Sequence, residues 1–198
     1  SPGEGKSTAS LALARNFSEL GRRVLLIDAD MRNPSLHKKM AIDNAIGLSN
    51  FLAGAASLTD VLHYTEMVGL AVITTGPLPP NPAELLQDDN MRRLLADGGE
   101  LYDLVIIDGP PVMGLADAPI LANLSEGVML VVQAGSTRKT LAVNAVKRLQ
   151  AARAQIVGVL INKFEAKHAT YGYYGKDTGY GDFSYYTAGE ESRRRIGR

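Results

Sequence analysis

Long runs of apolar residues recur along the chain and are separated by stretches in which apolar and polar residues mix. The runs occupy residues 24–27, 70–74, 104–107, 127–132 and 156–161. Continuous apolar runs of this length are typical of strands that are buried on both faces of a parallel sheet. We therefore expect five buried strands.

The stretches between these runs favour helices. In residues 6–20 the apolar side chains of Leu11, Ala14 and Phe17 recur at helical spacing, and Gly21 follows as a stop signal. Further helices are expected over residues 47–52, in two segments from 83 to about 96, and over 137–152. The rest of residues 33–67 indicates short helices and turns.

Strands that alternate with helices indicate an α/β fold. In such folds a parallel sheet carries helices on both faces, and the crossovers between parallel strands are right-handed. The length of 198 residues suits one domain with a sizeable core. Together with the phosphate-loop pattern at the start of the chain, these features predict a P-loop NTPase-like sheet.

The first eight residues form a glycine-rich turn that runs directly into a helical pattern. In this arrangement backbone N–H groups and the positive end of the helix bind polyphosphate. The lysine ammonium then reaches the outer phosphates, and the next hydroxyl ligates Mg²⁺. A chance turn before an amphipathic helix is the alternative. The predicted nucleotide-binding residues are Pro2, Gly3, Glu4, Gly5, Lys6, Ser7 and Thr8.

The phosphate-loop pattern also predicts features upstream of the chain. The pattern G-x-x-x-x-G-K-[ST] requires a glycine one residue before Ser1, and a buried strand normally leads into the loop. We expect this first strand to be missing and the chain to be the C-terminal part of a longer polypeptide. A membrane segment or a regulatory region would then lie upstream.

Three aspartates mark the ends of predicted buried strands. Asp28 and Asp30 follow residues 24–27, and Asp108 follows residues 104–107. The carboxyl ends of parallel strands form the edge at which such sheets bind ligands, and an aspartate there commonly holds Mg²⁺. The alternative is that these aspartates only cap the turns that follow. Asn162, at another strand end, is a candidate adenine contact.

Composition excludes several other classes of function. The formal net charge is zero, so no general attraction to nucleic acid is expected. Cysteine is absent, which excludes disulfides and thiolate metal sites, and the three histidines lack ligand spacing. The apolar runs are too short to cross a bilayer.

The C-terminal region differs from the rest. Residues 169–188 mix glycine and tyrosine without a period that would bury one face, so we predict a folded domain over residues 1–166 and a flexible tail over 167–198. A low-complexity tail in which tyrosine only makes aromatic contacts is the alternative. Six of the eight tyrosines lie here: Tyr171, Tyr173, Tyr174, Tyr180, Tyr185 and Tyr186.

Taken together, these motifs resemble the cytoplasmic catalytic domain of the bacterial tyrosine kinases that govern capsule and exopolysaccharide export. The resemblance covers essentially the whole chain. It rests on the phosphate loop at residues 2–8, the acidic strand at 25–32, the motif at 105–111, the segment 79–86 and the tyrosine tail.

The resemblance implies an ATP- and Mg²⁺-dependent protein-tyrosine autokinase that phosphorylates the tail of a neighbouring copy. A tyrosine hydroxyl is mostly protonated at neutral pH and needs a proton acceptor when it attacks. We assign that role to Asp28, with Asp30 supporting Mg²⁺ or substrate placement, although the two assignments are exchangeable. Lys6 neutralises the transferring phosphoryl group, while Ser7, Asp108 and, as a further ligand, Asp28 hold Mg²⁺.

The resemblance also implies partners. These are further copies of the chain in a homo-oligomer, with a ring as one arrangement, a transmembrane polysaccharide co-polymerase or activator domain, and a cognate tyrosine phosphatase. The expected location is the cytoplasmic face of the bacterial plasma membrane. Phosphates on the tail would add negative charge and loosen the oligomer.

A second class of function stays open from the sequence. The partition and septum-positioning ATPases belong to the same broad P-loop group and use ATP to change their assembly state. They typically carry a second lysine early in the loop, at the position that Ser1 holds here. In that alternative the chain is a nucleotide-dependent switch without kinase activity, and its tail binds a partner.

Overall fold

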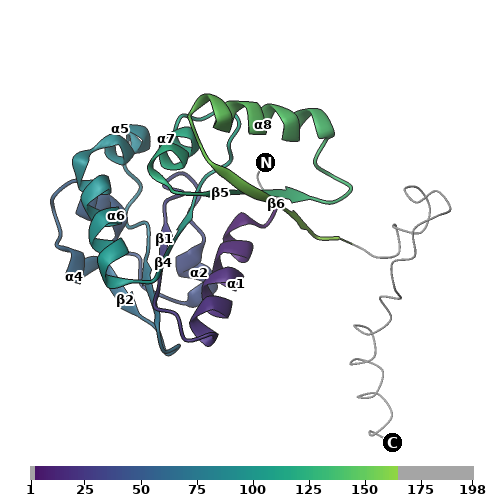
Figure 1. The fold of residues 1–198 in the computed structure, drawn as a ribbon. Helices are drawn as coiled ribbons and strands as arrows, with labels where there is room; N and C mark the ends of the chain where they lie inside the picture. Colours follow the sequence, from purple (N-terminus) through teal and green to yellow (C-terminus); the bar gives the residue numbers. More distant parts are fainter. Residues whose placement is uncertain (1–2, 165–198) are drawn as a thin grey trace, which may run out of the picture. The chain divides into compact units, whose positions relative to one another are not determined.

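The computed structural model describes residues 3–164 (Figure 1). The elements of its first half are α1 Lys6–Glu19, β1 Val24–Asp28, α2 Leu36–Met40, α3 Leu48–Leu52, α4 Leu58–Val61, β2 Leu62–Tyr64 and β3 Leu70–Ile73. Those of its second half are α5 Pro82–Gln87, α6 Asp89–Leu101, β4 Leu104–Asp108, α7 Asp117–Leu124, β5 Val128–Gln133, α8 Lys139–Ala151 and β6 Ile156–Asn162.

The strands form two hydrogen-bonded sheets. The first has the order β2-β3-β1-β4, in which β1 pairs in parallel with both β3 and β4, and β2 runs antiparallel to β3. The second consists of β5 and β6 in parallel. The mostly parallel α/β fold of the prediction is confirmed, but the described strands divide between two sheets.

Helices cover both faces of the first sheet. Alternate residues of its central strand, β1, point to opposite faces, and the residues on both faces are apolar. Leu25 and Ile27 of β1 pack into a core with α3, α5, α6 and α7. Val24 and Leu26 pack into a second core with α1 and α2. The β5–β6 pair has its own small core, in which Leu130 packs with α7 and α8.

Two elements were not predicted from the sequence. β2 lies within the stretch for which we expected only helices and turns, because a three-residue edge strand leaves too little alternation to detect. α7 carries Pro119 in its first turn, where the missing N–H costs nothing, so the proline does not break it. In addition, α6 continues to Leu101, beyond the predicted end near residue 96.

None of the helices within residues 3–164 is long and apolar enough to span a bilayer. Ser1, Pro2 and the predicted tail with its six tyrosines lie outside the described residues.

Candidate nucleotide and phosphoryl-transfer site

The phosphate loop leads directly into α1, a helix of 14 residues that begins at Lys6. Its N-cap is Gly5, at φ 87°, a residue without a side chain that could cap the helix. The N-terminus of a helix favours an anion, and the first turn of α1 holds no acidic residue that would oppose one. The geometry fits a polyphosphate.

Gly5 is favoured by its backbone angle and by the small space at this position. A Cβ at this position would collide with the side-chain amide of Asn162, which lies at the end of β6. Asn162 Nδ2 donates a hydrogen bond of 2.9 Å to the carbonyl oxygen of Glu4. Asn162 thus holds the phosphate loop through the backbone of Glu4. Its contact with adenine stays a prediction.

Side chains that follow β5 and β6 hold the loop in place. The Thr137 hydroxyl donates to Glu4 Oε1 over 2.8 Å and also accepts from the Gln133 backbone N–H. The Lys163 ammonium donates to the Gly3 carbonyl over 2.7 Å. Glu4 is consequently buried, with 5% of its surface exposed. These hydrogen bonds therefore hold the described part of the phosphate loop in position.

Asp28 and Asp108 stand next to each other at the ends of two paired strands. They are partners in the parallel register of β1 and β4, and both are almost completely buried. Ser10, one turn into α1, donates to Asp108 Oδ1 over 3.1 Å. Asp108 Oδ2 is buried and has no hydrogen-bond partner among the described residues.

The pKa of Asp108 is raised to about 6. Burial is the main cause, because it penalises the charged carboxylate, and the negative charge of Asp28 adds to it. The Ser7 hydroxyl, the Ser10 hydroxyl and the charge of Lys6 lower this pKa in part. Lys6, Ser10 and Asp108 also line one cavity of ≈ 150 Å³. The loop lysine and the Asp108 carboxylate therefore share one small site.

Asp28 organises the chain that follows its strand. Its carboxylate accepts hydrogen bonds from the backbone N–H groups of Asp30, Ser35 and Leu36. Burial raises the pKa of Asp28, and these backbone hydrogen bonds oppose the rise. The capping role that we weighed as an alternative is thus present in the geometry. It does not compete with a catalytic role, because a fixed carboxylate can do both.

Asp30 is the more accessible of the two neighbouring aspartates, with 8% of its surface exposed. Its Oδ1 accepts from the backbone N–H groups of Arg32 and Asn33, while Oδ2 accepts no hydrogen bond within the described part of the chain. The Arg32 guanidinium binds Asp117 with both Nε and Nη2, at 2.7 and 3.2 Å. This pair fastens the loop after β1 to the start of α7.

The structure brings most of the predicted site residues together, and adds some. Around Asp108 lie Lys6, Ser7, Asp28 and the unpredicted Ser10. Thr8 is exposed and accepts from Lys39. The supporting residues that sequence reasoning missed are Ser10, Thr137, Lys163 and Asp117. Only Ser10 carried a signal, one helical turn after Lys6, since the others lie far away in sequence.

The residues present fit a magnesium ion that is shared with a nucleotide. No cluster of three or more His, Asp or Glu side chains exists in residues 3–164 that could hold a metal alone. Mg²⁺ is usually bound by one or two protein ligands together with phosphate oxygens and water. The buried Oδ2 of Asp108, which has no hydrogen-bond partner among the described residues, fits such a role, because a cation there would stabilise its charge.

Comparison with known proteins finds relatives over most of the chain. A family model described as an AAA domain matches residues 2–163. Tyrosine-protein kinase YwqD of Bacillus subtilis (strain 168) is 42% identical over 175 residues, which are 88% of this chain and 74% of YwqD. Tyrosine-protein kinase etk of Escherichia coli (strain K12) is 38% identical over 162 residues, which are 81% of this chain but only 22% of that protein.

Solved structures show the same fold. The kinase domain of Escherichia coli tyrosine kinase ETK superposes with a TM-score of 0.78 at 33% identity, over 91% of this chain and 69% of that chain. The septum site-determining protein MinD from Pyrococcus horikoshii OT3, solved with Mg-ADP, superposes with a TM-score of 0.70 at 23% identity, over 83% of this chain and 67% of that chain. The second likeness shows the fold alone. The chain belongs to the bacterial protein-tyrosine kinases that include YwqD and Etk, within the P-loop group of AAA-type domains.

Proposed function

We propose that the chain transfers the γ-phosphoryl group of ATP, with Mg²⁺, to tyrosines in the tail of a neighbouring copy. The observation that carries this proposal is the grouping of Lys6, Ser7 and Asp28 around the buried Asp108. Bound Mg²⁺ would neutralise charge on the phosphates. Lys6 and the loop amides bind the transferring group, and Ser7 and Asp108 supply the protein ligands.

The geometry favours the exchanged assignment of the two aspartates near β1. Asp28 is fully buried, and its two oxygens already accept three backbone hydrogen bonds. Asp30 Oδ2 accepts none among the described residues. We therefore propose that Asp30 accepts the proton of the incoming tyrosine. Asp28 then orients the loop and supports the metal.

A strand before the phosphate loop would complete the sheet between β4 and β5. These two strands are not paired with each other, and residues 104–107 of β4 are only half-buried. The small cavity near Lys6 is lined on one side by Ile107 and on the other by Val128 and Leu130. A polypeptide that supplied such a strand should therefore melt at a higher temperature.

The activity is placed in polysaccharide export by kinship with the capsule kinases. We propose that it regulates polymerisation and export of an exopolysaccharide at the cytoplasmic face of the membrane. The match covers only 22% of etk, so that relative is a much longer polypeptide. A membrane activator domain, fused or separate, and a tyrosine phosphatase are the partners that such a cycle needs. Homo-oligomers, including rings, would bring the tail of one copy to the site of the next.

Labelled ATP with Mg²⁺ tests the proposal. Wild-type protein should gain phosphotyrosine in residues 171–186, and Lys6→Met should gain none. The same assay is run on the longest polypeptide that the gene encodes, so that an upstream activator is included. If both polypeptides hydrolyse ATP and change assembly state while no tyrosine is phosphorylated, the chain is the assembly switch instead.

Two further variants separate the aspartates. Asp30→Asn should abolish phosphoryl transfer to tyrosine while nucleotide binding is retained. Asp28→Asn should weaken nucleotide binding as well, because the segment that follows β1 loses a carboxylate oxygen that accepts hydrogen bonds from its backbone N–H groups. The reverse pattern would restore Asp28 as the proton acceptor.

A further inference from the structure

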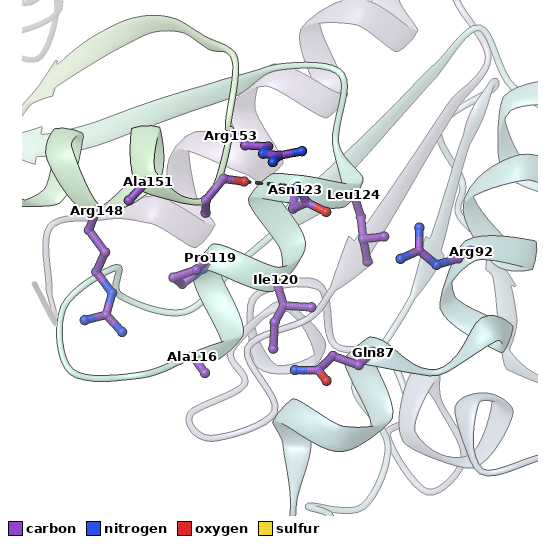
Figure 2. Close-up of a pocket in the computed structure, with 11 residues that line it drawn as sticks. Gln87, Arg92, Ala116, Pro119, Ile120, Asn123, Leu124, Arg148, Ala151 and Arg153 are labelled. Carbon is purple, nitrogen blue, oxygen red and sulfur yellow. Dashed lines mark hydrogen bonds between the residues drawn. The ribbon is translucent and has the colours of Figure 1, made fainter.

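A second pocket, of ≈ 690 Å³, lies where α7 meets the C-terminal end of α8 and the junction of α5 with α6 (Figure 2). Its lining includes three arginines and an apolar wall, and no acidic residue lines it. It shares no lining residue with the cavity at Lys6. In Figure 2, Ile120 and Leu124 lie between Arg148 on one side and Arg92 on the other.

The arginines of this pocket have few partners. The side chains of Arg92 and Arg153 make no ion pair and no hydrogen bond within residues 3–164, and Asp88, the acid one turn before Arg92, caps α6 instead. Arg148 donates through Nη2 to the Leu115 carbonyl over 2.7 Å, and its Nε is buried with no partner in the described part of the chain. The pocket therefore holds positive charge that its own lining does not neutralise.

Arg153 occupies a backbone position that favours glycine. Its φ is 62°, and it follows the end of α8 in a Schellman turn: Arg153 N–H donates to the Gln150 carbonyl, and Ala154 N–H to the Leu149 carbonyl. Glycine is the usual residue at this position because a Cβ is disfavoured in the left-handed region. An arginine here carries a conformational cost that a glycine would avoid.

We propose that this pocket binds phosphotyrosine presented by a second copy of the chain. A phosphotyrosine side chain combines an aromatic ring with close to two negative charges. The ring fits against Ile120 and Leu124, while guanidinium groups suit a phosphate because they donate in pairs. The occupant follows from charge complementarity and from the six tyrosines of residues 171–186. The proposal rests on the proposed function, which makes those phosphates.

This site would change the order of events during autophosphorylation. A copy whose tail already carries a phosphate would be held by a neighbour at a pocket apart from the nucleotide site. Its remaining tyrosines would then be close to a kinase, and later phosphorylations would be faster than the first one. The pocket thereby recognises the product of the reaction and retains it.

Binding is measured with a synthetic fluorescent peptide of residues 182–190 that is phosphorylated at Tyr185 and Tyr186. The full chain is first dephosphorylated and no ATP is added, so the result does not depend on its own kinase activity. Arg153→Gly and Arg92→Gln should each weaken binding about tenfold, the loss expected for one charge-assisted contact. Arg153→Gly should melt no lower than wild type, because glycine suits its backbone angle.

The matched control is Arg93→Gln, an exposed arginine on the same helix that does not line the pocket. It should leave binding unchanged. An equal loss with Arg93→Gln would reduce the effect to general electrostatics and overturn the proposal. So would equal binding of the unphosphorylated peptide, or displacement of the peptide by the same concentration of inorganic phosphate, which would indicate an anion site without recognition of tyrosine.

Discussion

Asp28 and Asp108 are direct partners in the parallel register of β1 and β4, so two buried carboxylates end neighbouring strands at the same level. Each raises the energy of charging the other, and burial adds to the cost. This arrangement is unfavourable in the protein alone. The charge of Lys6 already offsets part of this cost, and a cation bound in the site would offset more of it.

Asp108→Asn should stabilise the nucleotide-free protein while abolishing binding of Mg-ATP. The folded-state pKa of about 6 lies above the ordinary 3.8, so the folded protein holds an unfavourable charge at every pH above about 6. That difference corresponds to ~3 kcal/mol at pH 7.5. Thermal melting at pH 7.5 without nucleotide should therefore rise for the variant.

The matched comparison is Ser10→Ala, which removes one hydrogen bond to Asp108 but keeps its charge. It should lower the melting temperature and retain weaker nucleotide binding. A variant Asp108→Asn that melts below wild type under these conditions contradicts the prediction.

Gly5→Ala should abolish nucleotide binding and destabilise the protein more than an ordinary left-handed glycine would. Its Cβ meets the Asn162 amide, whereas a Cβ at Gly21, which has a similar φ of 81°, meets nothing within 4 Å. Gly21→Ala should therefore cost only about 1 kcal/mol of unfolding free energy, from the backbone angle alone. Urea unfolding of both variants gives the comparison.

The double variant Gly5→Ala with Asn162→Gly tests the cause. Removing the Asn162 side chain should recover part of the stability that Gly5→Ala loses, because the collision is relieved. If the two changes are additive, Asn162 is not the obstacle.

Arg32→Met should lower the melting temperature by roughly 5 °C, because it leaves the Asp117 carboxylate, which is only 1% exposed, without its bidentate partner. Arg23→Met is the control, since it breaks an ion pair with Asp103 in which both side chains are substantially exposed. The control should shift melting by roughly 1 °C. Equal shifts would show that the Arg32 pair contributes no more than a surface ion pair.

The Arg23–Asp103 ion pair should contribute to the fall in melting temperature at acid pH. The Arg23 side chain holds the pKa of Asp103 at about 2, below the ordinary 3.8. Because the folded pKa is the lower one, this contribution is present above about pH 4 and is lost as the pH falls toward 2. Asp103→Asn should flatten the fall in melting temperature within that window, and an unchanged slope would contradict the assignment.

The grouping of the phosphate loop with Asp28 and Asp108 could be predicted because its signals are local. Four apolar residues followed by aspartate mark β1 and β4, and Gly5-Lys6-Ser7 marks the loop before α1. Parallel strands then bring their carboxyl ends to one edge, which is why Asp28 and Asp108 lie together. Period and motif are sufficient for this part of the fold.

The supporting contacts could not be predicted, because they join distant parts of the chain. Thr137 meets Glu4 across 133 positions, and Arg32 meets Asp117 across 85. Neither pair has a sequence pattern, and the strand order that brings them together depends on the whole packing. The arginine pocket is a further example, since Arg92 and Arg153 are ordinary surface residues in the sequence.

Helix α7 touches both places at which phosphate chemistry is expected. Its first residue, Asp117, is tied to Arg32, two positions after Asp30, and its later residues Ile120 and Leu124 form the wall of the arginine pocket. The same eight-residue helix therefore anchors the loop that carries Asp30 and forms one wall of the arginine pocket. A substitution in α7 is consequently expected to affect both sites, whereas Arg92 and Arg153 lie outside this helix.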